Sequence, residues 1–188
     1  MQHQLIKLID LTNTNFIMGS LNGDKVLNSL RSMVCAQSKV VEISFQQMQG
    51  VDACFIRNSI ASFAKMMCGQ TGVMVSDVEN IDISENLMYG FKAKDMPLLI
   101  KHSDELATIF SAVPCGVKDI LSHSYTQNET TTEQIAKKFG LSSPNASAKL
   151  KKLHKNGYLL AEKREARTGG LEYVFKPIFK CNKLNFQI

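Results

Sequence analysis

The chain has 188 residues, 44% of them hydrophobic, which is enough for the packed cores of two small domains. No run approaches the roughly 20 apolar residues of a membrane span, and the first residues lack the layout of a secretory signal, so we expect a cytoplasmic protein with no membrane contact. Five scattered cysteines argue against a disulfide framework and a thiolate zinc site, and we expect free, buried thiols.

Residues 1–101 alternate between strand-like and helix-like segments. In chain order these are a strand over 4–11, a helix over 22–34, a strand over 39–45, a helix over 51–67, a strand over 71–76, a helix over 84–91 and a strand over 97–100. The helical segments have apolar residues at helical spacing, and the second strand is a β-branched run typical of a buried strand. The alternation predicts an α/β domain with a small sheet over residues 1–101.

Three stretches of this half carry a resemblance to a known family. GDKVLNSL, VVEISFQQMQGVDACFIRNSIASF and VMVSDVENIDISENL are similar to the STAS-like domain, a small α/β module related to bacterial anti-sigma-factor antagonists. The resemblance covers roughly residues 20–100 and rests on the strand, turn and helix around Ile43 to Phe55. It implies a module for self-association or for contact with a regulatory protein.

The start of the helix after the central strand matters in that family. In its antagonist branch a phosphorylated serine lies there, where backbone donors and the helix dipole can hold an anion. The corresponding residues here are Asp52, Ala53 and Cys54. Neither Ala53 nor Cys54 has a hydroxyl, so a phosphorylation switch is not implied. We interpret Asp52 as a helix N-cap and Cys54 as a buried structural thiol, although an exposed Cys54 would be a candidate redox sensor.

Residues 102–188 are expected to form a second, α+β domain that begins with a connector. A helix over 104–112 is predicted to break at Pro114, because proline lacks a donor and cannot continue a helix without strain. A helix over 117–124 would then be the first helix of this domain. The helix over 104–112 could instead connect or dimerise the two halves.

The segment 130–175 has the order of a winged helix-turn-helix, with two short helices, a tight turn and a basic hairpin. The first helix begins with the spacing of a capping box, formed by Thr130 with Glu133 or by Thr131 with Gln134. A left-handed glycine is expected to end this helix at position 140.

The second helix of this segment is the candidate reader of DNA. Pro144 lies in its first turn and Gly157 stops it, and Ala146, Leu150 and Leu153 would face the core. Strands over 158–164 and 171–176 follow, around a turn at 167–170 that would be the wing.

The positive charge of the chain belongs to this half. Residues 1–101 contain 9 Lys and Arg against 9 Asp and Glu, whereas residues 102–188 contain 13 against 8. Neutralisation of phosphates by lysine and arginine dominates the non-specific affinity of proteins for nucleic acid. A basic cluster on this scaffold therefore favours a DNA-binding surface over the alternative, a charged surface that is only solvated.

The candidate DNA-binding residues are Ser143, Asn145, Ser147, Lys149, Lys151, Lys152, Lys155, Arg164, Arg167 and Thr168. Asn145 and Ser147 would contact base edges, the lysines phosphates, and the two arginines would place the wing at the minor groove.

The sequence therefore predicts a transcriptional regulator of prokaryotic type that binds double-stranded DNA, acts as a homodimeric repressor or autoregulator and uses the STAS-like domain for assembly or signal input. An alternative is an interaction adaptor whose winged domain binds an acidic protein surface. An enzyme acting on nucleic acid is the third hypothesis. It lacks an acidic metal cluster and a phosphate-binding glycine loop, and the adjacent residues His102, Ser103 and Asp104 seldom converge into a triad. We expect no catalytic residue, cofactor or metal site.

Overall fold

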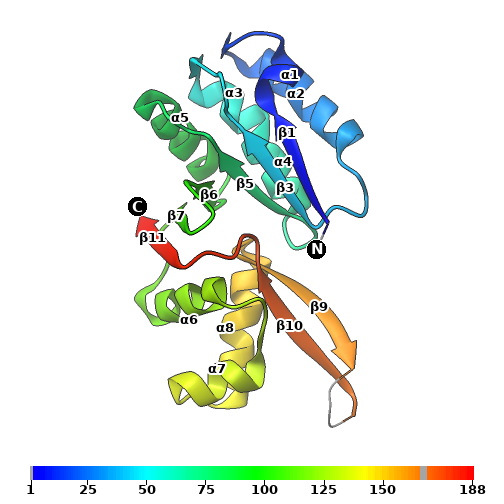
Figure 1. Cartoon of the computed structure of the whole chain (residues 1–188), viewed down its shortest axis with the longest axis vertical. Helices are drawn as coiled ribbons and strands as arrows, with labels where there is room; N and C mark the ends of the chain where they lie inside the picture. Colours follow the sequence, from blue (N-terminus) through cyan, green and yellow to red (C-terminus); the bar gives the residue numbers. More distant parts are fainter. Residues whose placement is uncertain (1, 166–168) are drawn as a thin grey trace.

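The computed structural model describes residues 2–165 and 169–188 and shows an α/β protein (Figure 1). A mixed, mainly parallel six-stranded sheet has the order β1-β3-β5-β6-β7-β11, and a small antiparallel sheet has the order β8-β10-β9. The strands of the large sheet are β1 (His3–Lys7), β3 (Val40–Ser44), β5 (Gly72–Ser76), β6 (Leu98–Lys101), β7 (Leu106–Phe110) and β11 (Lys183–Gln187). The fold class predicted for the first half is thus confirmed at the level of an α/β sheet.

Helices cover one face of the large sheet. They are α1 (Leu8–Thr12), α2 (Ser20–Met33), α3 (Ala53–Asn58), α4 (Ile60–Met67) and α5 (Ile81–Lys92). The first four strands of the sheet are parallel and lie in chain order. Because right-handed crossovers then add each new strand on the same side, α2, α3–α4 and α5 lie on one face. We call these elements, together with β7 and β11, the α/β unit.

Alternation along the strands divides the side chains between two cores. Val41 and Ile43 of β3 face the helices, where they pack with Leu30 of α2 and Phe55 of α3. Their neighbour Val40 belongs to a second core on the opposite face. Both faces of the sheet are therefore buried, which explains why β3 and β5 consist of buried residues throughout.

The predicted helix over 51–67 is wrong as one continuous helix. A short strand β4 (Gly50–Val51) pairs in parallel with β2 (Phe16–Ile17), and α3 begins only after Asp52. The helix then breaks at Ser59, whose backbone has φ −105° and ψ −95° and whose hydroxyl donates to the Phe55 carbonyl at 2.6 Å. The backbone N–H of Ser59 donates to the same carbonyl at 2.9 Å, so the hydroxyl adds a second hydrogen bond at the point where the helix changes direction.

The segment after β6 is a strand and not the helix predicted over 104–112. β7 pairs antiparallel with β6, with Leu99 opposite Ile109 and Ile100 opposite Thr108. Leu106, Ile109 and Phe110 have helical spacing, but the β-branched pair Thr108 and Ile109 also suits a strand, and pairing with β6 decides between the two. The predicted strand over 4–11 is likewise shorter, because α1 begins at Leu8.

The remaining elements form what we call the C-terminal unit, residues 115–177. They are α6 (Cys115–Thr126), β8 (Thr130–Thr131), α7 (Thr132–Phe139), α8 (Ser143–Lys155), β9 (Leu159–Glu165) and β10 (Leu171–Pro177). The helices and strands predicted over 117–124, 130–139, 144–155, 158–164 and 171–176 are all present. After β10 the chain returns to the large sheet, where β11 pairs in parallel with β7.

The C-terminal unit packs against the α/β unit through the second core (Figure 1). The second core combines Val40, Met74 and Leu99 of the sheet with Leu150 of α8 and Phe175 of β10. At Gly72 of β5 an added Cβ would lie 2.7 Å from the Ile178 side chain, so the approach is close. The sheet thus contains strands from both sides of the boundary predicted between residues 101 and 102, and the two units share buried surface.

The cysteines are free, as expected, but most are not buried. Cys35, Cys54 and Cys115 are exposed, Cys68 is half-buried and Cys181 is buried. The expectation for Cys54 was wrong because Phe55 and Ile56 occupy the buried side of the first turn of α3, and successive helical residues point in different directions. Burial raises the pKa of the Cys181 thiol, which stays protonated.

Candidate nucleic-acid interface

The turn between α7 and α8 is fixed by the local signals that the sequence contains. The sequence allows two alternative capping boxes, and the structure has the one formed by Thr131 and Gln134. The Gln134 backbone N–H donates to the Thr131 hydroxyl at 3.3 Å, and the Thr131 backbone N–H donates to the Gln134 side-chain oxygen at 2.8 Å. Thr130 is instead buried in β8 and donates to the Phe175 carbonyl at 3.4 Å. Gly140 ends α7 with φ +62°, the left-handed conformation that glycine adopts without strain.

Helix α8 has one buried side and one outer side. Its N-cap Ser142 accepts from the Asn145 N–H at 3.4 Å, and Pro144 lies in the first turn. Ala146, Leu150 and Leu153 are buried, as the spacing predicted. The other side of α8 carries its lysines.

The C-terminal end of α8 is attached to the α/β unit. The Cys68 thiol of that unit donates to the Lys155 carbonyl at 3.3 Å, and a Cβ added to Gly157 would lie 3.1 Å from Met96. Just beyond, the buried Tyr125 hydroxyl donates to the Tyr158 carbonyl at 3.0 Å. Burial raises the pKa of Tyr125, so this hydroxyl keeps its proton. Since this end is docked, the N-terminal end of α8 is the one that points away from the large sheet.

The residues of α8 that were predicted to contact DNA differ in how far they are exposed to solvent. Five are exposed, namely Ser143, Asn145, Lys151, Lys152 and Lys155. Ser147 is half-buried, and so is Lys149, whose ammonium donates to the Gly116 carbonyl of α6 at 3.0 Å. Lys149 is therefore engaged within the protein, and the outer side of α8 is formed by the other three lysines.

Arg164 of β9 is held by two carboxylates. Its Nε donates to Glu172 of β10 at 3.0 Å, and its Nη1 donates to Glu129 in the segment before β8. The hydrogen bonds that Arg164 donates, first to Glu129 and then to Glu172, raise the pKa of the guanidinium above its usual value. Arg167 and Thr168, the other two predicted residues of the hairpin, lie outside the described residues.

Two residues that sequence reasoning missed connect α8 to the hairpin. The Tyr173 ring of β10 lies 5.5 Å from the Lys151 ammonium and 5.4 Å from the Lys163 ammonium, distances at which an aromatic face attracts a cation. Lys163 and Tyr173 are direct partners in the β9–β10 register. The signal was present in the hairpin sequence, because pairing its two strands around the turn places a basic residue opposite an aromatic one.

The lysines on this surface have no acidic partner within the described residues. The ion pairs of the C-terminal unit join Arg164 to Glu129 and Glu172, and Lys176 to Glu162, but none includes Lys151, Lys152, Lys155 or Lys163. We call these four residues the lysine face. The basic excess of this half is thus divided into cations that are paired within the protein and cations that are left to solvent.

The remaining candidates have structural roles. Asp52 is the N-cap of α3, as interpreted from the sequence, and its carboxylate accepts from the Phe55 N–H at 2.7 Å and the Gly19 N–H at 3.0 Å. The His102 ring lies 2.9 Å from the Thr108 hydroxyl across the β6–β7 hairpin, and no contact joins it to Ser103 or Asp104 among the described residues. Within the same residues no group of three acidic, histidine or cysteine side chains could hold a metal ion.

Comparisons with known proteins do not place this chain in a family. No family model, curated protein sequence or solved structure matches this chain. In the part of the chain that the structure describes, no helix is both long and apolar enough to cross a membrane.

Proposed function

We propose that the C-terminal unit is a winged helix-turn-helix that binds double-stranded DNA, with α8 as its reading helix and the β9–β10 hairpin as its wing. The protein would then be a transcriptional regulator, acting as a homodimeric repressor or autoregulator. The observation that carries this proposal is the lysine face, a set of exposed cations that no carboxylate of the described residues neutralises.

The direction of α8 supports the same proposal. Its docked C-terminal end leaves the N-terminal turn free to enter a major groove, where Ser143 and Asn145 could reach base edges. Lys151, Lys152 and Lys155 would lie along the phosphates on either side. The hairpin extends away from the body of the molecule, as a wing must if it is to contact DNA beside the reading helix (Figure 1).

We assign the α/β unit to assembly or signal input, following its resemblance to the STAS-like domain. Consecutive parallel strands with all their helices on one face are compatible with that small module. A stretch of exposed apolar side chains favours a protein contact, because Phe16, Met18 and Leu21 are 54%, 52% and 77% exposed. The same stretch would serve a regulatory partner if the protein were an interaction adaptor.

Fluorescence anisotropy with labelled duplex DNA over a salt series tests the proposed function. If the four lysines of the lysine face contact phosphates, the logarithm of the binding constant should fall with the logarithm of the salt concentration with a slope of roughly −3 to −4. Absence of binding at low salt, or binding that does not weaken as salt rises, would contradict DNA binding and leave the adaptor hypothesis.

A further inference from the structure

The large sheet of the α/β unit ends in two edge strands, β1 on one side and β11 on the other (Figure 1). An edge strand has backbone N–H and C=O groups that no neighbouring strand uses, and these groups can pair with a strand of another chain. Whether an edge can pair with its own copy depends on its register and on its side chains. The two edges differ in both respects.

The hydrogen bonds to β7 show which residues of β11 face outward. The Lys183 N–H donates to the carbonyl just before β7 at 3.0 Å, and the Gln187 carbonyl accepts from the N–H just after β7 at 2.9 Å. Alternate residues of a strand direct their backbone groups to the same side, so Lys183, Asn185 and Gln187 all face β7. The backbone groups of Leu184 and Phe186 point away from β7, and no other strand of the described residues pairs with them.

These outward groups are self-complementary. When β11 of a second copy runs antiparallel, with a two-fold axis at Asn185, Leu184 of each copy lies opposite Phe186 of the other. Each of these pairs exchanges both of its N–H···O bonds, so the pairing uses all the outward backbone groups of Leu184 and Phe186 in both copies.

The side chains of β11 suit the same pairing. Leu184 and Phe186 are partly buried against the second core, so contact between them across the axis would extend this core from one copy to the other. On the opposite face of the sheet, Lys183 would lie opposite Gln187 of the second copy, and no like charges would face each other. Asn185 would lie opposite itself, where the two side-chain amides can donate to one another.

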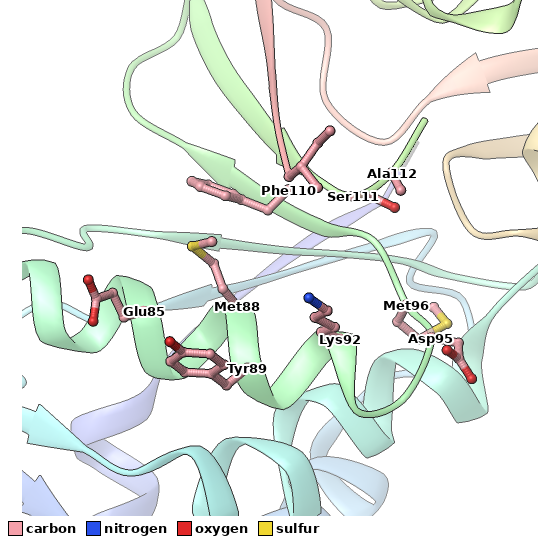
Figure 2. A pocket seen from close by; sticks show the side chains of 10 residues that line it. Glu85, Met88, Tyr89, Lys92, Asp95, Met96, Phe110, Ser111 and Ala112 are labelled. Atoms are coloured by element: carbon pink, nitrogen blue, oxygen red, sulfur yellow. The ribbon is translucent and has the colours of Figure 1, made fainter. Parts of the chain in front are cut away.

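The sheet face that carries Asn185 is open beside β11. The register places Asn185 on the helix-covered face, because it pairs with Thr108 and, through it, with Ile100 of the helix-side core. On this face a cleft of about 600 Å³ separates α5 from Phe110 at the end of β7 (Figure 2). Ile188, the residue after β11, also lines the cleft and is 88% exposed. Helix α5 therefore leaves room at this edge for the strand of a second copy.

The edge at β1 does not match itself in this way. The Gln2 carbonyl accepts from the Lys39 N–H on the side of β3, so the outward backbone groups of β1 belong to His3, Leu5 and Lys7. An antiparallel pairing that uses all three residues would place His3 opposite Lys7 of the second copy. Two basic side chains would then face each other on both sides of the axis, which disfavours the pairing.

We propose that β11 is a dimerisation edge, at which two copies join their large sheets through antiparallel pairing centred on Asn185. The inference names the surface that forms the homodimer of the proposed function. Its tests use no DNA, so a dimer without affinity for DNA would contradict only the proposed function. A monomer that binds DNA would contradict only the pairing of β11.

Analytical ultracentrifugation of the full chain tests the pairing through charge. The wild type should reach twice the monomer mass of 20.9 kDa as its concentration rises. Asn185→Asp places two carboxylates side by side at the axis and should raise the dissociation constant of the dimer about fivefold. Gln187→Glu makes the same charge change opposite Lys183 of the second copy and should not weaken the dimer. A monomeric wild type, or equal weakening by both variants, overturns the proposal.

Disulfide trapping tests the register. The background variant has its exposed cysteines replaced by serine, Cys35→Ser, Cys54→Ser and Cys115→Ser. Asn185→Cys in this background should give a disulfide-linked dimer on mild oxidation, because residues opposite each other in a non-hydrogen-bonded pair have Cα atoms about 4.5 Å apart. Gln187→Cys is at a more exposed position, but its copies would lie four residues apart along the paired strands, and it should stay monomeric. Trapping of both variants alike, or of neither, overturns the proposed pairing.

Discussion

The cations of the C-terminal unit fall into two groups with different surroundings. On the lysine face, the three lysines of α8 and Lys163 of β9 have no carboxylate partner among the described residues. In the β9–β10 hairpin, Arg164 and Lys176 are each joined to glutamates. A count of charges along the sequence treats these groups as equal, although only the first is free to neutralise phosphates.

The difference has a geometric cause. On antiparallel strands, oppositely charged side chains lie directly across from one another, as Arg164 and Glu172 do in the β9–β10 register. Along α8 an acidic partner would have to lie three or four residues away, and the helix contains no acidic residue. The helix therefore keeps its charge available, and we expect most of the affinity for DNA to come from α8.

The largest expected effect comes from reversing charges on α8. The double variant Lys151→Glu, Lys155→Glu should weaken duplex DNA binding about a hundredfold at low salt, because two phosphate contacts are lost and replaced by repulsion. Fluorescence anisotropy measures the loss. The matched control is Lys7→Glu, Lys25→Glu, which changes the net charge equally at two exposed positions of the α/β unit and should stay close to the wild type. Equal losses in both variants would mean that total charge, and not the lysine face, determines binding.

A smaller effect is expected at the point where α8 meets the hairpin. Tyr173→Ala should weaken DNA binding about fivefold, since the ring that positions Lys151 and Lys163 contributes roughly 0.5 to 1 kcal/mol per cation. Tyr173→Phe keeps the ring and serves as the control in the same anisotropy assay. A loss in Tyr173→Phe as large as in Tyr173→Ala would instead assign the effect to the hydroxyl.

The helices and hairpin of the C-terminal unit could be predicted because their signals are local. The capping box at Thr131, the left-handed Gly140 and the proline at position 144 each act within a few residues, and tertiary packing does not override them. β7 and β11 could not be predicted in this way. Each is a strand because of its partner, so assigning residues 104–112 to a helix also removed the strand with which β11 pairs.

The candidate interface was predictable to a similar degree. Helical spacing identified the outer side of α8, including Lys151 and Lys155. Helical spacing could not show that Arg164 donates to Glu129, because 35 residues separate the two in the chain. The contact between Lys149 and Gly116 likewise depends on how α6 packs against α8.

Because Arg164 is paired with glutamates, removing one of these glutamates is expected to strengthen DNA binding and not to weaken it. Glu129→Gln removes one carboxylate from the guanidinium, so it should strengthen DNA binding about threefold, as both a repulsive charge and a competitor for Arg164 are lost. Anisotropy at low salt measures this gain. Glu133→Gln, on the exposed first turn of α7, removes the same charge without touching Arg164 and is the control. An equal gain in both variants would show that Arg164 is not the group released.

The smallest effect concerns the second pair of the hairpin, in which the Lys176 ammonium donates to Glu162 at 2.6 Å. This hydrogen bond lowers the pKa of Glu162 in the folded protein. A carboxyl whose folded-state pKa lies below its unfolded value stabilises the protein above the unfolded pKa, and this contribution is lost as the pH falls through the folded-state pKa.

Glu162 is 42% exposed, so solvent screening limits the contribution to about 0.5 kcal/mol. Urea unfolding of Glu162→Gln should therefore show a loss of that size at about pH 7 that disappears at about pH 2, after Glu162 is protonated in the wild type. A loss that persists at low pH would mean that Glu162 stabilises the hairpin through packing, and Lys176 would then count among the cations available to DNA.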